Sequence, residues 1–235
     1  MFVNSALGPE ADVSRYNCFV SWAIFDTVSA AEAQAVLSVA RRRKFKRGET
    51  IFHEGDPGDA LHLIEQGHVA LRVTTPMGEV ATLRILGPGD HFGELAVVSP
   101  APRNATVVAV NAVETRTLHR DQLAALRGDH PGVDAVLLEA VIAEVRRLSL
   151  QLTDAMFVPV PKRLARRLAE LADQFRDGTG TVEIPLTQDD VAGLVGTTRP
   201  TVNKCLQELA DNGAIALSRG RVTVLDEQML ARKGR

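Results

Sequence analysis

Residues 92–106 read FGELAVVSPAPRNAT, and this stretch decides how the rest of the chain is interpreted. It holds a carboxylate, Glu94, and a guanidinium, Arg103, framed by Gly93 and Ala105, whose backbone N–H groups a ligand can approach closely. A carboxylate accepts hydrogen bonds from sugar hydroxyls, and a planar guanidinium suits a phosphate. The stretch therefore predicts a site for a sugar-phosphate ring.

The composition indicates a globular chain. Its 235 residues suffice for one large domain or two modest ones, with 45% hydrophobic and 24% charged residues. Cys18 and Cys205 lie far apart, which suits a reducing cytoplasm and excludes a disulfide framework or a four-cysteine iron–sulfur cluster. The chain has no apolar run of membrane-spanning length and no secretory signal, so we expect a cytoplasmic protein with no membrane partner.

Short strands are predicted in the first half of the chain. Between residues 45 and 118, short apolar runs alternate with glycine-containing turns, a pattern typical of an antiparallel β-barrel or jelly roll. Before it, residues 1–18 form an N-terminal extension, and short helices are expected over 22–40 with Ser29 as an N-cap.

A long helix is predicted after Pro131, ending before the stiff segment Pro159-Val160-Pro161. Its apolar residues are spaced alternately three and four apart, which is the seam of a coiled coil. We expect this seam to pair with the same helix of a second copy, although it could instead cover the chain's own barrel. The seam residues are Leu138, Val141, Val145, Leu148, Leu152 and Ala155.

The last third carries a helix-turn-helix pattern, with helices over 162–175, 187–195 and 199–211 and a wing strand over 218–224. Counting Gln188 as the first position, Ala192, Gly196 and Val202 are the fifth, ninth and fifteenth. These positions require a small residue, a residue tolerant of left-handed backbone and an apolar anchor. The net charge of −2 does not by itself indicate nucleic-acid binding, so the inference rests on this motif. A small helical bundle is the alternative.

Several side chains of this motif could contact DNA. Thr198 can cap the second helix, and Pro200 is tolerated in its first turn. Arg can read guanine, Asn can read adenine, and basic side chains can contact phosphates. The residues expected at the DNA are Gln188, Thr198, Arg199, Pro200, Thr201, Asn203, Lys204, Arg219 and Arg221.

Together these motifs resemble the CRP/FNR family of bacterial transcription regulators, of the CRP-like, actinobacterial type. Residues 92–106 resemble the phosphate-binding cassette of cyclic-nucleotide-binding domains. Residues 198–204, TRPTVNK, are similar to the family's Ser-Arg-Glu-Thr-Val recognition helix, with Pro200 in place of Glu. The resemblance spans about 19–230 and implies an α+β fold: a nucleotide-binding jelly roll (19–130), a dimerisation helix (131–158) and a winged helix-turn-helix domain (159–235).

The resemblance also implies roles in a ligand pocket. Glu94 would accept the ribose 2′-hydroxyl and Arg103 would pair with the cyclic phosphate. Backbone N–H groups of Gly93, Leu95 and Ala105 would assist, and Asn104 stands where the family has Ser or Thr.

Two positions of the long helix correspond to the family's adenine-contacting Thr–Ser pair. They are Leu148 and Ser149, with Ser149 coming from the partner subunit. Leu148 cannot hydrogen-bond an amino group, so we expect weak ligand dependence.

Cyclic AMP is thus the candidate allosteric ligand, and duplex DNA, a second copy of the chain and RNA polymerase are the expected partners. Another small ligand, or a degenerate pocket in which Glu94 and Arg103 pair with each other or with solvent, is the alternative. No segment remains for a catalytic domain, so no enzyme is expected. We expect no metal, haem or iron–sulfur cluster. Although a haem- or metal-sensing variant is conceivable, most of His62, His68 and His91 are expected to be surface residues.

Overall fold

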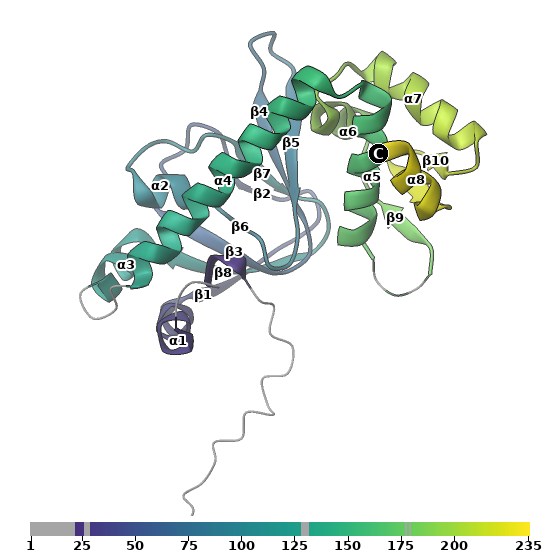
Figure 1. The fold of residues 1–235 in the computed structure, drawn as a ribbon. Helices are drawn as coiled ribbons and strands as arrows, with labels where there is room; N and C mark the ends of the chain where they lie inside the picture. Colours follow the sequence, from purple (N-terminus) through teal and green to yellow (C-terminus); the bar gives the residue numbers. More distant parts are fainter. Residues whose placement is uncertain (1–21, 26–28, 128–131, 177, 179) are drawn as a thin grey trace, which may run out of the picture.

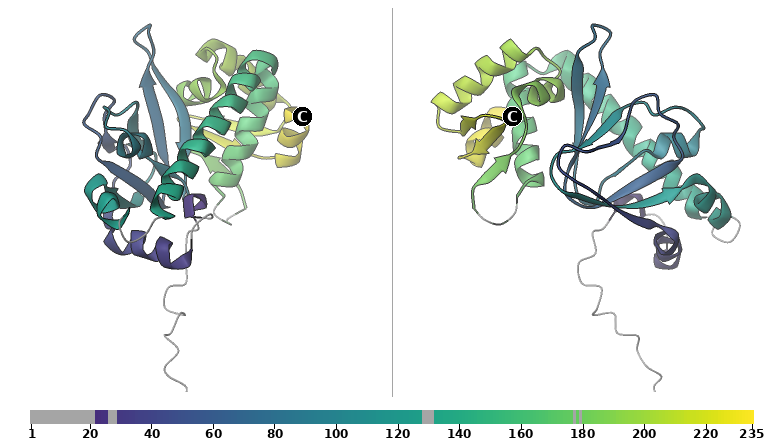
Figure 2. Two further views of the ribbon diagram at one scale, coloured as in Figure 1. Left: turned by 60° about the vertical axis from the view of Figure 1, so that its left-hand side comes forward. Right: turned by 180° about the vertical axis from the view of Figure 1, so that it is seen from behind.

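The computed structural model describes residues 22–25, 29–127, 132–176, 178 and 180–235. The predicted extension 1–18, with Cys18, lies outside these residues. The described chain has an α+β fold: a jelly roll, then a long helix, then a smaller domain with a helix-turn-helix (Figures 1 and 2). The jelly roll consists of two separate sheets, so the expected β-barrel is not a closed one.

Both sheets of the jelly roll are four-stranded and antiparallel. The first has the order β1-β8-β3-β6 and comprises β1 (Arg41–Phe45), β8 (Val113–His119), β3 (Ala60–Gln66) and β6 (His91–Phe92). The second has the order β2-β7-β4-β5 and comprises β2 (Thr50–Phe52), β7 (Thr106–Ala109), β4 (Val69–Thr74) and β5 (Val80–Leu86). Apolar side chains such as Ile64, Phe92 and Val107 fill the space between the sheets.

Short helices form a second apolar layer on the jelly roll. They are η2 (Ala23–Phe25), α1 (Ala30–Val39) and α3 (Arg120–Arg127). Ser29 caps α1 as predicted, because its hydroxyl accepts a bond from the Glu32 backbone N–H (3.3 Å). Trp22 packs in this layer and donates from its indole nitrogen to the Ile64 carbonyl (3.1 Å).

The long helix α4 (Gly132–Phe157) runs along the jelly roll towards the C-terminal domain (Figure 1). It ends before Pro159, as predicted. Its seam faces outward in this chain: the side chains of Leu138, Val145, Leu148 and Leu152 are 50–63% exposed. The alternative, in which the seam covers the chain's own jelly roll, is therefore wrong for these four residues.

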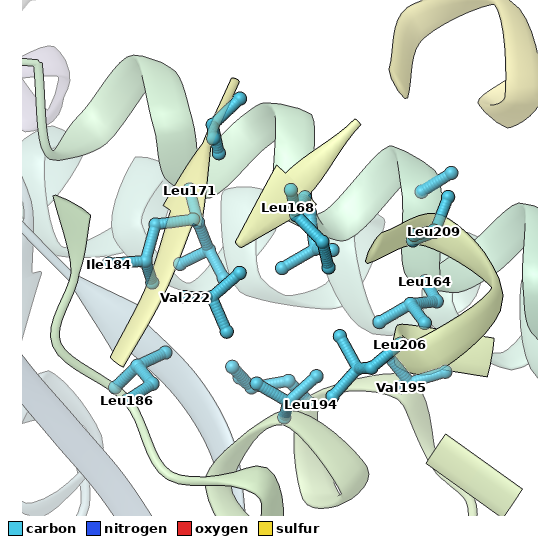
Figure 3. Close-up of a cluster of buried hydrophobic side chains, with 14 of the residues drawn as sticks. Leu164, Leu168, Leu171, Ile184, Leu186, Leu194, Val195, Leu206, Leu209 and Val222 are labelled. Carbon is cyan, nitrogen blue, oxygen red and sulfur yellow. The ribbon is translucent and has the colours of Figure 1, made fainter. Parts of the chain in front are cut away.

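The C-terminal domain gathers its elements around one apolar core (Figure 3). Four residues from three of these elements are fully buried there: Leu164, Leu168, Ile184 and Leu206. The elements are α5 (Val160–Gln174), β9 (Val182–Ile184), α6 (Gln188–Val195), α7 (Arg199–Asp211), β10 (Ile215–Ser218), β11 (Arg221–Val224) and α8 (Glu227–Gly234). Strands β10 and β11 form the hairpin that the sequence predicts as a wing.

The C-terminal domain is docked on the β4–β5 hairpin. The buried carboxylate of Asp190 accepts hydrogen bonds from the Thr82 hydroxyl (2.7 Å) and the Arg72 guanidinium (3.0 Å). A Cβ on Gly193 would lie 2.6 Å from the Thr82 backbone nitrogen, so only glycine allows this approach. The first helix of the helix-turn-helix therefore rests directly on a strand of the jelly roll.

Candidate nucleotide pocket and DNA-reading surface

The stretch 92–106 folds around a glycine that no other residue could replace without strain. Gly93 follows β6, has a φ of +84° and precedes the short helix α2 (Glu94–Val98). A Cβ there would lie 2.5 Å from Nη1 of Arg103 and 2.7 Å from the Ala60 carbonyl oxygen. Gly93 thus provides both the turn and the space for the Arg103 side chain.

Arg103 is buried and held in one position. Its Nη1 donates to the Gly93 carbonyl (3.1 Å), its Nη2 donates to the Ala60 carbonyl (2.9 Å), and its guanidinium lies 4.1 Å from the centre of the Phe52 ring. The Nη groups are therefore bound to backbone carbonyls rather than to Glu94. Its Nε is buried and has no hydrogen-bond partner among the described residues. A buried cationic donor without a partner is costly to the fold.

A cavity of about 190 Å³ opens beside this guanidinium. Gly93, Glu94, Leu95, Arg103, Asn104 and Ala105, all predicted from the sequence, line it together. Burial raises the pKa of Glu94 above its usual range. Phe52, Leu71 and Val107 add apolar walls. The cavity is thus charged at the cassette and apolar along its sides.

Sequence reasoning missed Arg84 on β5 and Glu144 on α4, which also line the cavity. The signals were an arginine within an apolar strand and a glutamate one helical turn before Leu148. Among the described lining residues, neither Leu148 nor Ser149 is present: both are exposed, and the Ser149 hydroxyl donates to the Val145 carbonyl (2.9 Å).

The expectation that most of the three histidines lie on the surface is wrong. His62 is buried, with Nδ1 near the hydroxyls of Thr115 and Thr117 and its ring stacked on Phe92. His68 is buried against the C-terminal domain, where its ring stacks on Phe175. Strand β3 turns His62 inward, and the turn between β3 and β4 places His68 against the C-terminal domain. A sequence without a known register reveals neither placement.

The helix-turn-helix has the packing that its spacing predicts. Thr187 and Asp190 form a capping box at the start of α6, and Gly196 ends the helix with a φ of +68°. Ala192 and Val202 are buried where the two helices cross. The recognition helix α7 is therefore fixed by its inner face, and its outer face is left for contacts.

The outer face of α7 exposes Arg199, Pro200, Thr201 and Lys204. Arg199 makes an exposed ion pair with Asp189 (3.2 Å). Two side chains differ from expectation: the Thr198 hydroxyl contacts the Thr201 hydroxyl (3.0 Å) instead of capping the helix, and Asn203 is half-buried.

The wing brings two further arginines to the same part of the domain. Gln188, Arg199, Arg219 and Arg221 line one hollow between α6, α7 and the wing. Arg221 pairs with Glu183 (2.6 Å). The structure thus gathers predicted DNA-contacting residues from all three elements.

Comparison with known proteins agrees with this division. Residues 42–130 match the model of the cyclic nucleotide-binding domain, and residues 162–233 match that of the Crp-like helix-turn-helix domain. The CRP-like cAMP-activated global transcriptional regulator of Mycobacterium tuberculosis is 36% identical over 215 residues, covering 90% of this chain and 96% of the relative. The cyclic AMP receptor protein of Thermus thermophilus is 33% identical, covering 88% and 94%.

Solved structures give the same picture. A CRP/FNR-family transcriptional regulator of Thermus thermophilus aligns with a TM-score of 0.70 at 26% identity, covering 83% of this chain and 98% of the other. The molecule is a DNA-binding transcription regulator with a cyclic-nucleotide-binding domain. The chain belongs to the CRP/FNR family. None of its described helices is long and apolar enough to cross a membrane.

Proposed function

We propose that this regulator is a homodimer that binds a cyclic nucleotide, with cyclic AMP as the first candidate, and reads DNA through α7. The observation that carries the ligand proposal is the convergence of the Arg103 guanidinium and the Glu94 carboxylate on one cavity. A cyclic phosphate would pair with the guanidinium, and a ribose hydroxyl would donate to the carboxylate. The names of two relatives, which describe cAMP activation and a cyclic AMP receptor, support the choice of ligand.

The cassette residues take the roles that the family resemblance implies. Glu94 accepts the ribose 2′-hydroxyl, Arg103 binds the phosphate, and backbone N–H groups of Gly93, Leu95 and Ala105 assist. Asn104 can donate through its amide. Support comes from their common position around one cavity.

The dimer interface in this proposal is the outward seam of α4. Exposed leucines and valines at coiled-coil spacing are stabilised by pairing with the same helix of a second copy. The apolar side chain of Leu148 can be buried against Leu148 of the second copy without any contact to a nucleotide. The helix pair is therefore formed without ligand, and cyclic AMP adds a modest increase in DNA affinity.

The DNA-binding part of the proposal places the two recognition helices of the dimer in successive major grooves. The exposed side chains of Arg199, Thr201 and Lys204 reach base edges or phosphates, and the half-buried Asn203 lies beside them. Thr198, Pro200 and Gln188 border the contact, and Arg219 and Arg221 approach the backbone. RNA polymerase is the further partner, and the cytoplasm is the site of action.

Calorimetric titration of the full-length protein with cyclic AMP and cyclic GMP, with sedimentation analysis of its mass, tests the proposal. We expect one nucleotide per chain on a dimer. If neither nucleotide binds but the dimer still recognises duplex DNA, the regulator is ligand-independent or senses another molecule. A monomer at working concentration contradicts the proposed interface.

A further inference from the structure

Arg84 and Glu144 meet across the cavity from two different elements. Arg84 extends from β5 and Glu144 from α4, and Nη1 of Arg84 lies 3.3 Å from Oε2 of Glu144. Each side chain is about three-quarters buried. Neither residue belongs to the cassette.

Flanking partners hold both groups in place. Arg147 donates to the Glu144 carboxylate through Nε (2.8 Å) and Nη2 (2.5 Å), and Asp90 lies 3.6 Å from Arg84. Arg147 also donates to Gln151 (2.6 Å). Because each member of the pair keeps a second charged partner, a ligand edge can engage both without leaving an isolated charge.

The pair presents a hydrogen-bond donor, Arg84, beside an acceptor, Glu144, and both are charged near neutral pH. Hydrogen bonds from Arg147 lower the pKa of Glu144, in contrast to Glu94 in the same cavity, whose pKa is raised by burial. Glu144 is therefore a reliable acceptor that cannot donate.

Purine bases differ at the edge that such a pair would meet. Adenine presents the N7 acceptor beside the N6 amino donor, whereas guanine presents two acceptors, N7 and O6. An Arg–Glu pair complements the adenine edge. With guanine, O6 would face the carboxylate, and the two acceptors would repel each other.

We propose that Arg84 and Glu144 determine base specificity in the nucleotide pocket, with Arg84 donating to adenine N7 and Glu144 accepting from the 6-amino group. This inference rests on the proposed nucleotide binding and adds its base-recognition residues. Phe52 and Leu71 line the same cavity as Arg103 and this pair, so the base of a nucleotide held at Arg103 can lie against these apolar walls.

The pairing also gives the base a contact on α4 that Leu148 cannot supply. Glu144 lies one turn before Leu148 and directly precedes Val145 of the seam. An adenine bound between Arg84 and Glu144 links β5 to the dimerisation helix. This link operates within one protomer.

Wild-type protein and ligand analogues test the assignment. We expect the full-length dimer to bind cyclic AMP about tenfold or more tightly than cyclic inosine monophosphate, which carries O6. Cyclic 7-deaza-AMP, which lacks the N7 acceptor, should also bind less tightly than cyclic AMP.

Two variants and one control complete the experiment. In Glu144→Gln the amide can donate to O6, so the preference for cyclic AMP over the inosine analogue should fall to about threefold or less. In Arg84→Met the 7-deaza analogue should bind as tightly as cyclic AMP. Glu139→Gln, on the same helix but outside the lining residues, should retain both wild-type preferences.

The outcomes separate the two proposals. If the wild type binds cyclic AMP and Glu144→Gln and Arg84→Met keep the wild-type preferences, the base assignment is overturned while nucleotide binding stands. Equal wild-type affinity for all three ligands also overturns the assignment. If no cyclic nucleotide binds the wild type, both proposals fail.

Discussion

The nucleotide pocket and the DNA-reading surface hold their cations in opposite ways. In the pocket, Arg103 is buried and held by backbone carbonyls, and Arg84 is about three-quarters buried and held by carboxylates. Arg199 on α7 instead makes one ion pair whose members are each 59% exposed. A fixed guanidinium is pre-organised for a small ligand of one shape. An exposed guanidinium, such as that of Arg199, can adjust its position to a DNA duplex. Substitutions in the pocket should therefore affect ligand binding and folding together, and those on α7 should affect DNA binding alone.

Arg103→Ala should give the largest effect. We expect nucleotide affinity to fall by about 2–4 kcal/mol, because the variant leaves the bound phosphate without its buried cation. Calorimetric titration measures the loss, and Arg47→Ala, at an exposed turn, is the matched control. Unchanged affinity in Arg103→Ala would remove the cassette assignment.

Thr82→Val tests the contact between the jelly roll and the C-terminal domain. The variant keeps the shape of the side chain but deletes the hydrogen bond to the buried Asp190 carboxylate, so docking should weaken by about 1.5–3 kcal/mol. In urea, fluorescence of the single tryptophan, Trp22, follows the jelly roll, and circular dichroism follows both domains.

The two unfolding curves should coincide in the wild type and separate in Thr82→Val. Thr74→Val, on the exposed end of β4, should behave as the wild type. Coincident curves in both variants would show that the Asp190 contact does not couple the domains.

Arg199→Ala should reduce operator affinity by about 1–3 kcal/mol and relax specificity at one base pair in each half-site. Its unfolding free energy should stay close to that of the wild type, because the side chain is exposed. Binding to single-base operator variants measures the change. A variant that loses stability as much as DNA affinity would contradict the contrast between the two regions.

His62 should make stability depend on pH. Burial lowers its pKa from 6.5 to about 3, so between these values the unfolded chain binds a proton that the folded chain does not. The stabilising contribution is complete above pH 6.5 and falls by about 1.4 kcal/mol per pH unit towards pH 3. His62→Phe, which keeps a ring against Phe92, should show a shallower slope in urea unfolding; an identical slope would contradict this assignment.

The sequence predicts those parts of the molecule whose residues are close in the chain. The cassette, the helix-turn-helix and the seam are each local patterns. The structure places the cassette residues around one cavity, forms α6 and α7, and leaves four seam residues exposed on α4, but Thr198 does not cap α7. The sequence does not reveal contacts that depend on strand register or helix rotation. Arg84 and Glu144 are 60 residues apart and meet only once β5 and α4 are placed. His62 could not be assigned to the inner face without that register.

In the proposed dimer, α4 pairs through Leu148 without nucleotide, so that the dimer already binds DNA. The most direct test of this pairing uses an operator selected from random duplexes. It compares the operator affinity of the wild type with that of Leu148→Thr, each measured with and without saturating cyclic AMP. We predict that nucleotide changes wild-type affinity by less than about tenfold, and that Leu148→Thr binds less tightly without nucleotide and responds more to it. Wild-type binding that requires nucleotide, by a factor of about one hundred or more, would contradict the account.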